Sequence, residues 1–153
     1  MAEQSAVNLP PDLDSLQWDI RTEVSAGGMR LDLVIEGLPE EKEEEGNEPP
    51  CLLWVVEVKV QSSFHETTPV DSEMLGPWVT ESEDGDVLVN QMRNYDFWLA
   101  RQAAGHSAGF VLGVKDLTDC MPEGLTEKWT CLTWTGLALS IRGALEEEAP
   151  RGK

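Results

Sequence analysis

One segment constrains the fold more than any other: the nearly continuous apolar run CLLWVVEVKV at residues 51–60. A run of this kind, with one Trp and four Val, is typical of a central β-strand that is buried on both faces. Glu57 and Lys59 interrupt it. Burying two charges in a central strand is costly unless they are paired, bound to a metal or placed at a solvated edge. The pair therefore needs a structural or functional reason.

The residues before this run predict a β-hairpin. Residues 17–24 (QWDIRTEV) alternate apolar and polar side chains, which is the pattern of a half-buried strand. The break SAGG follows, and residues 29–37 (MRLDLVIEG) predict the returning strand. Asp32 lies on this second strand, which the hairpin order places beside the central one.

The clearest helix is predicted over residues 87–105 (VLVNQMRNYDFWLARQAAG), with Asp86 available as its N-cap and Gly105 placed to end it. Residues 107–116 (SAGFVLGVKD) then predict another buried strand. Strand, helix and strand together predict a crossover unit that joins two parallel strands. Apolar side chains recur at helical spacing at Leu88, Met92, Tyr95 and Leu99.

The end of the chain predicts a short strand at 128–134 (KWTCLTW) and a helix at 135–148 (TGLALSIRGALEEE). One apolar face of that helix would hold Leu137, Ile141 and Leu145.

A length of 153 residues suits one domain. We place it at residues 17–148, as an α/β domain with a mixed central sheet flanked by helices. Residues 1–16 predict a flexible N-terminus, and residues 149–153 a disordered tail.

Negative charge is concentrated in two predicted connections. The chain has 29 acidic and 11 basic residues and a net charge of −18. Residues 36–48 and residues 66–86 each hold seven acids, and only one Lys lies in the two together. The rest of the chain has 15 acidic and 10 basic residues, a net charge of −5. A phosphate-binding surface would favour the opposite sign.

The charged residues of the central strand suit metal-assisted chemistry. Glu57 and Lys59 are two positions apart and share one face of the strand, with the backbone carbonyl of Val58 near the same edge. With Asp32 on the neighbouring strand, two carboxylates and a carbonyl can hold Mg²⁺ through oxygen ligands. Such a metal polarises a phosphoryl oxygen and acidifies an attacking water, while Lys59 stabilises charge on the pentacovalent state.

The order of these motifs is similar to that of a known family. RLDLVIEG, then WVVEVKV, then QMRNY resembles the PD-(D/E)XK nuclease superfamily, and the QxxxY pair Gln91 and Tyr95 resembles its RecB-like branch. The resemblance implies a restriction-endonuclease-like fold whose N-terminal helix is reduced or absent here. It also implies Asp32 and Glu57 as metal ligands, Lys59 as the catalytic lysine, and Gln91 with Tyr95 lining the site. Simple core packing is the alternative for Tyr95.

Further residues are weaker candidates. Glu23 is a candidate additional acid of the site, and a plain surface carboxylate is at least as good a reading. Arg93, Arg101 and Lys115 are the basic residues nearest the site in sequence and are candidate phosphate contacts. For these three, solvated surface charges are the favoured alternative.

The sequence thus predicts a Mg²⁺- or Mn²⁺-dependent nuclease, a hydrolase that acts on nucleic acid, with DNA favoured. Selective cutting would then need a homodimer or a separate specificity subunit. The alternative is a non-catalytic module that uses its acidic surface and exposed Trp residues to bind a basic protein. The polar N-terminus and the lack of a long apolar run predict a cytoplasmic protein with no membrane partner.

Overall fold

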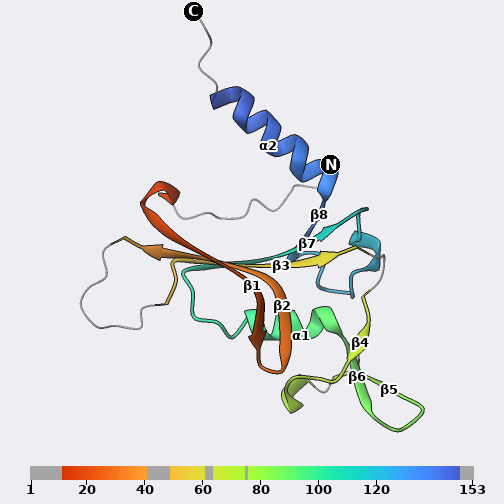
Figure 1. Ribbon diagram of the computed structural model, residues 1–153. Coiled ribbons are helices and arrows are strands. Elements are labelled where there is room, and N and C mark those ends of the chain that lie inside the picture. Colours follow the sequence, from red (N-terminus) through yellow and green to blue (C-terminus); the bar gives the residue numbers. More distant parts are fainter. Residues whose placement is uncertain (1–11, 41–48, 61–63, 75, 149–153) are drawn as a thin grey trace, which may run out of the picture.

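A five-stranded mixed sheet organises the chain (Figure 1). The computed structural model describes residues 12–40, 49–60, 64–74 and 76–148. The strand order is β1-β2-β3-β7-β8. The strands are β1 (Leu16–Ala26), β2 (Met29–Pro39), β3 (Leu52–Lys59), β7 (His106–Gly113) and β8 (Trp129–Thr133).

The pairing confirms the predicted hairpin and crossover. β1 pairs antiparallel with β2, and β2 pairs antiparallel with β3, so the strand that carries Asp32 lies beside the strand that carries Glu57. β3 pairs in parallel with β7, and β7 in parallel with β8. The apolar run is therefore an interior strand, with β2 on one side and β7 on the other.

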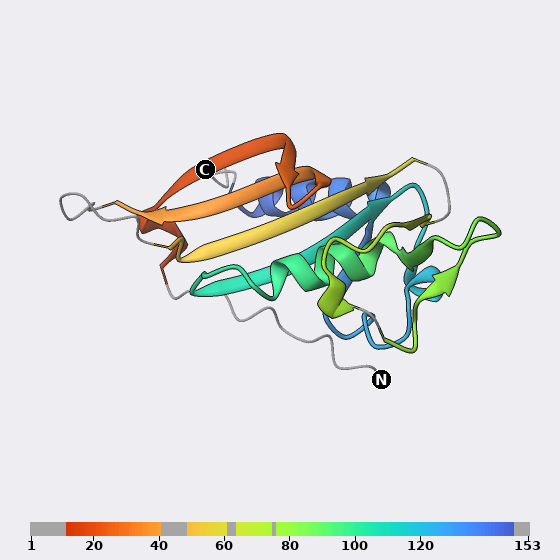
Figure 2. The same cartoon turned by 90° about the horizontal axis from the view of Figure 1, so that it is seen from below.

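Helix α1 (Gln91–Leu99) covers one face of the sheet (Figures 1 and 2). Its inward side chains pack on β2, β3, β7 and β8 in one core cluster. A close approach to β8 requires Gly109 on β7, because a Cβ there would lie 2.4 Å from the Trp129 ring. The core includes Leu31, Leu53, Val55, Met92, Leu99, Val111 and Trp129.

The predicted start and end of this helix were wrong. Residues Val87–Asn90 form strand β6, and the N-cap is Asn90, whose side chain accepts a hydrogen bond from the Met92 amide at 3.0 Å. The helix ends at Leu99 instead of continuing toward Gly105. Two β-branched residues in VLVN favour a strand, and Asn is among the best N-cap residues, so pairing and capping outweigh the apolar periodicity.

The predicted acidic connection at 66–86 is a folded element. It contains β4 (Glu66–Thr67), a 3-10 turn (Ser72–Met74) and β5 (Thr80–Glu81). With β6 these strands make a small sheet of order β4-β6-β5. We call residues 64–90 the acidic finger, which projects beside the N-terminal end of α1 (Figure 1).

The other acidic segment begins inside the sheet. Strand β2 continues to Pro39, so Glu36 is a strand residue and pairs with Arg21 on β1. Residues 41–48 lie outside the described residues.

The N-terminal region predicted at 1–16 is described from residue 12 onward. There it forms a 3-10 turn (Leu13–Ser15) that leads directly into β1. Residues 1–11 and the tail 149–153 lie outside the described residues.

Helix α2 (Trp134–Glu148) extends from the end of β8 on the side of the sheet away from α1 (Figure 1). The predicted apolar face exists, but it is not packed: Ile141 is 53% and Leu145 63% exposed. No helix in the described part of the chain is long and apolar enough to cross a membrane.

Aromatic side chains line the face of the sheet away from α1. The ring centroids of Trp18 and Trp54 are 6.1 Å apart, and those of Trp54 and Phe110 are 5.7 Å apart. Side chains alternate along a strand, so Trp54 points away from the core side of β3. Trp18 is 44% exposed, and this face is therefore partly open to solvent.

The N-cap can be tested by substitution. Asn90→Ala removes the side-chain bond to the Met92 amide and should lower the free energy of unfolding by about 1 kcal/mol. Asp86→Ala, at the position that the sequence favoured, is the matched control and should change it by less than about 0.5 kcal/mol. Urea denaturation followed by circular dichroism measures both. A larger loss for Asp86→Ala would contradict the assignment.

Candidate functional site

The centre of the site is a buried ion pair on β3. Glu57 is 4% exposed, and Lys59 Nζ lies 2.7 Å from Glu57 Oε1. The Lys59 side chain is itself only 12% exposed. A charge pair in the apolar central strand is tolerated because each charge neutralises the other.

Gln91 connects this pair to helix α1. Its Nε2 donates to Glu57 Oε1 at 2.8 Å, while its Oε1 accepts from Lys59 Nζ at 3.0 Å and from the backbone N–H of His65 at 3.3 Å. Gln91 is 2% exposed, and it is the first residue of α1. The amide therefore contacts both the acid and the base and fixes their relative position.

Tyr95 belongs to the core and to the site at once. Its ring packs against Trp129, with centroids 6.4 Å apart. Its hydroxyl accepts from Gln91 Nε2 at 3.3 Å and donates to the backbone carbonyl of Arg30 at 3.2 Å. Burial, and next the nearby charge of Glu57, raise the pKa of Tyr95, so the phenol stays protonated at neutral pH.

Asp32 approaches the pair from β2. The regular β2–β3 pairing runs from Gly37–Leu52 to Leu33–Val56 and stops before Asp32. Beyond that point the Asp32 carboxylate accepts the backbone N–H of Val58 at 2.8 Å. The side chain thus replaces a ladder hydrogen bond and is held at the Glu57–Val58–Lys59 segment.

The negative charge of Asp32 makes it harder for the buried Glu57 carboxyl to ionise. Burial raises the pKa of the Glu57 carboxyl, and the negative charge of Asp32 raises it further, whereas the hydrogen bond and charge of Lys59 lower it. The net effect is a raised pKa. Glu57 Oε2 is buried and has no hydrogen-bond partner among the described residues. A buried carboxylate oxygen in this state is costly unless something binds it.

A divalent cation suits this donor set. Asp32, Glu57 and the Val58 carbonyl offer the hard oxygen atoms that Mg²⁺ and Mn²⁺ prefer, and a cation would satisfy Glu57 Oε2. Within the described residues no three His, Cys, Asp or Glu side chains converge, so the remaining ligands would be water and substrate oxygens. Mg²⁺ commonly keeps several waters.

Comparisons with protein-family models, curated proteins and solved structures found no match.

The structure does not bring Glu23 to this group. Glu23 is an exposed residue of β1 whose carboxylate pairs with Arg30, and its φ is +54°. This contact favours the reading of Glu23 as a surface carboxylate bound to a neighbouring Arg.

The three candidate phosphate contacts lie in two places. Arg93 and Arg101 line a pocket on the outer side of α1, away from the core face that carries Gln91. Lys115 is exposed two residues past Gly113, which pairs with Lys59 across the parallel strands. Of the three basic residues, Lys115 is therefore the one at the edge of the sheet where the ion pair lies.

Several contacts of the site were not predicted from sequence. The ring of Phe64 lies 5.6 Å from Lys59 Nζ, the His65 amide binds Gln91, and the Arg30 carbonyl binds Tyr95. Two of these three use backbone groups, which carry no sequence signal. For Phe64, the only sequence signal of a role at the site was its position shortly after the central strand.

The ion pair gives a pH-dependent stability prediction. Lys59→Met leaves a buried carboxylate without its partner, and we expect a loss of roughly 3 kcal/mol at neutral pH. The folded-state pKa of Glu57 already lies above its ordinary value, and losing Lys59 raises it further. Stability is then lost as the pH rises through that pKa, so the loss should shrink toward acidic pH.

The matched control is the double variant Glu57→Gln/Lys59→Met, which should recover most of the loss at neutral pH. Urea denaturation at acidic and neutral pH measures all three proteins. An equal loss for Lys59→Met at both pH values would show that Glu57 is not the group that depends on Lys59.

Proposed function

We propose that this chain is a metal-dependent nuclease of the PD-(D/E)XK type, which hydrolyses phosphodiester bonds of nucleic acid, with DNA favoured. The observation that carries the proposal is the buried oxygen of Glu57 that has no partner among the described residues, beside Asp32 and next to Lys59. Two acids and a lysine at this spacing are the ligands and the charge stabiliser that phosphodiester hydrolysis needs.

The residues have distinct roles in this proposal. Asp32, Glu57 and the Val58 carbonyl would hold Mg²⁺ or Mn²⁺, which when bound supplies a polarised phosphoryl oxygen and an acidified water. Lys59 is held in place by Glu57 and Gln91 and would stabilise negative charge on the phosphoryl group. Gln91 is a positioning residue, because it orients both side chains.

The order of elements supports a restriction-endonuclease-like fold. A hairpin carries Asp32, the central strand carries Glu57 and Lys59, and the crossover helix carries Gln91 and Tyr95 before a parallel strand. Each motif alone is permissive, whereas their arrangement around one buried ion pair is much more specific.

The alternative function is a non-catalytic module that binds a basic protein. The exposed Trp78, at 46%, and the net charge of −18 favour it. Salt titration separates the two, because nucleic-acid binding weakens steeply with salt. Absence of nucleic-acid binding even at low salt would favour the protein-binding module.

Metal-dependent nicking of plasmid DNA tests the proposal. Glu57→Gln and Asp32→Asn should each abolish nicking in Mg²⁺ or Mn²⁺, because each removes a charged ligand. Gln91→Leu should lower the rate by roughly 10- to 100-fold, as for other residues that orient metal ligands. Glu36→Gln, also on β2 but paired with Arg21, is the matched control and should keep wild-type nicking.

The raised pKa of Glu57 also sets the direction of the pH dependence. Metal affinity should fall as the pH drops through that pKa, because the protonated carboxyl is a poor ligand. Wild-type nicking by the Glu57→Gln variant, or equal loss in Glu36→Gln, would contradict the assignment of the site.

A further inference from the structure

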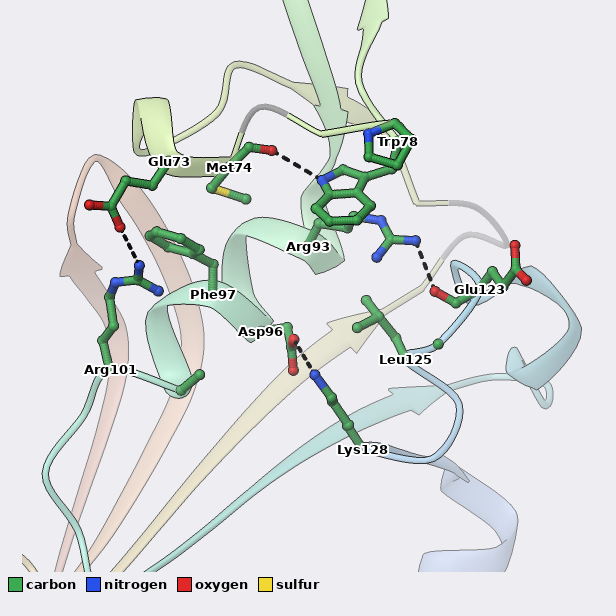
Figure 3. Close-up of a pocket in the computed structure, with 13 residues that line it drawn as sticks. Glu73, Met74, Trp78, Arg93, Asp96, Phe97, Arg101, Glu123, Leu125 and Lys128 are labelled. Atoms are coloured by element: carbon green, nitrogen blue, oxygen red, sulfur yellow. Dashed lines mark hydrogen bonds and ion pairs between the residues drawn. The ribbon is translucent and has the colours of Figure 1, made fainter.

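The pocket on the outer side of α1 has a volume of about 700 Å³. Figure 3 shows its walls: the finger segment with Met74 and Trp78, the outward side chains of α1, and the loop before β8. A volume of this size is within the range of small-ligand sites, which is about 300 to 1,000 Å³. Six of its thirteen lining residues are charged, and the others are apolar residues or Gly.

An Arg guanidinium group lies against each of two aromatic rings in this pocket. The Arg93 guanidinium lies 4.9 Å from the ring centre of Trp78, and that of Arg101 lies 3.4 Å from the ring centre of Phe97. The Trp78 indole is fixed by its N–H, which donates to the Met74 carbonyl at 3.1 Å. The pocket thus offers rigid planar surfaces together with positive charge (Figure 3).

The pocket is lined by three carboxylates, those of Glu73, Asp96 and Glu123, and by as many cations. Three of the eight Lys and Arg residues that the structure describes line the pocket: Arg93, Arg101 and Lys128. Arg93 has no carboxylate partner in the described part of the chain; it donates to the backbone carbonyl of Glu123 at 2.8 Å. The carboxylate that pairs with Arg101 belongs to Glu73, which is 72% exposed. Surface ion pairs of this kind are weak, so an incoming phosphate can replace Glu73 on Arg101.

One segment of chain links this pocket to the ion pair. Residues 64–78 begin at the site, where the His65 amide binds Gln91, and end in the pocket wall at Trp78. Between these points the segment is tied to α1 by Asn94, which contacts the Thr68 carbonyl and the Val70 amide. From Gln91 to Arg101 the helix and its last turn span about 15 Å.

We propose that this pocket binds an unpaired nucleotide of the substrate strand, with the base stacked on the exposed Trp78 indole and the phosphate on Arg93 and Arg101. Single-strand binding elsewhere combines base stacking on aromatic side chains with Arg contacts to the backbone. This inference rests on the proposed nuclease function, and it names a single-stranded segment next to the cleaved bond as the substrate feature. An acidic peptide would use the cations but would not need the exposed Trp78 indole.

The test measures binding without cleavage. Fluorescence anisotropy follows a fluorescein-labelled oligo-dT with the full chain carrying Glu57→Gln, at low salt and without a divalent metal. An abasic oligonucleotide of equal length keeps the phosphates and removes the bases. We expect it to bind about 5- to 150-fold more weakly, the range that corresponds to one stacked base.

Matched variants locate the binding. Trp78→Ala should weaken oligo-dT binding by a similar factor, and Trp78→Phe, which keeps a stacking face, should retain most of it. Trp18→Ala removes a Trp of nearly equal exposure, 44% against 46%, on the far face of the sheet and should have no effect. Arg101→Ala should weaken binding, whereas Arg142→Ala on α2 should not.

The outcomes separate the two proposals. Equal affinity for the abasic strand, equal loss with Trp18→Ala, no binding of oligo-dT, or full competition by poly-glutamate would each overturn the nucleotide pocket. Metal-dependent nicking by the wild type together with any of these leaves the nuclease proposal intact. Binding that depends on Trp78, with no nicking, would instead overturn the nuclease proposal and retain the pocket.

Discussion

The rest of the structure depends on a buried ion pair in a central β-strand. The buried charge of Glu57 is tolerated in β3 because Lys59 neutralises it and Gln91 donates a hydrogen bond to it. Lys59 lies on the same strand, whereas Gln91 comes from α1. That requirement links the strand to the helix, because α1 must begin where Gln91 reaches both charges. Strand β2 places Asp32 alongside, where its negative charge disfavours ionised Glu57. One carboxylate oxygen is still unsatisfied within the described residues, and this points to a cation as its partner.

The proposed nuclease function requires an acidic chain to act on a polyanion. Much of the negative charge lies in the acidic finger and in the segment that begins at Glu36, and exposed charges beyond about 8 Å are largely screened at physiological salt. Positive charge is found at the edge that Lys115 follows and in the pocket that contains Arg93 and Arg101. Affinity would then come from a bound cation and a few local contacts instead of from net charge.

Patterns of hydrophobicity predicted the sheet well, because burial has a strong period in sequence. The hairpin, the central strand and the parallel crossover followed from alternation and from the apolar run, and so did the placement of Asp32 near Glu57.

The predicted start of the helix was wrong because VLVN fits the apolar period of a helix and the pattern of a strand equally well, and the cap at Asn90 decides between them. The finger strands and the pocket were not predicted, since they depend on the pairing of two-residue strands with β6 and on contacts distant in sequence. For Tyr95 the two readings proved compatible, because a ring can pack in the core while its hydroxyl reaches the site.

The most direct measurement is anomalous diffraction from crystals of the full chain grown with Mn²⁺. The account predicts a manganese peak between the carboxylates of Asp32 and Glu57 and the backbone carbonyl of Val58, with Glu57 Oε2 as a ligand. The same crystals of the Glu57→Gln variant should lack that peak. Manganese bound only along the acidic finger, with Glu57 Oε2 hydrogen-bonded to a protein group, would contradict the metal site and the nuclease function built on it.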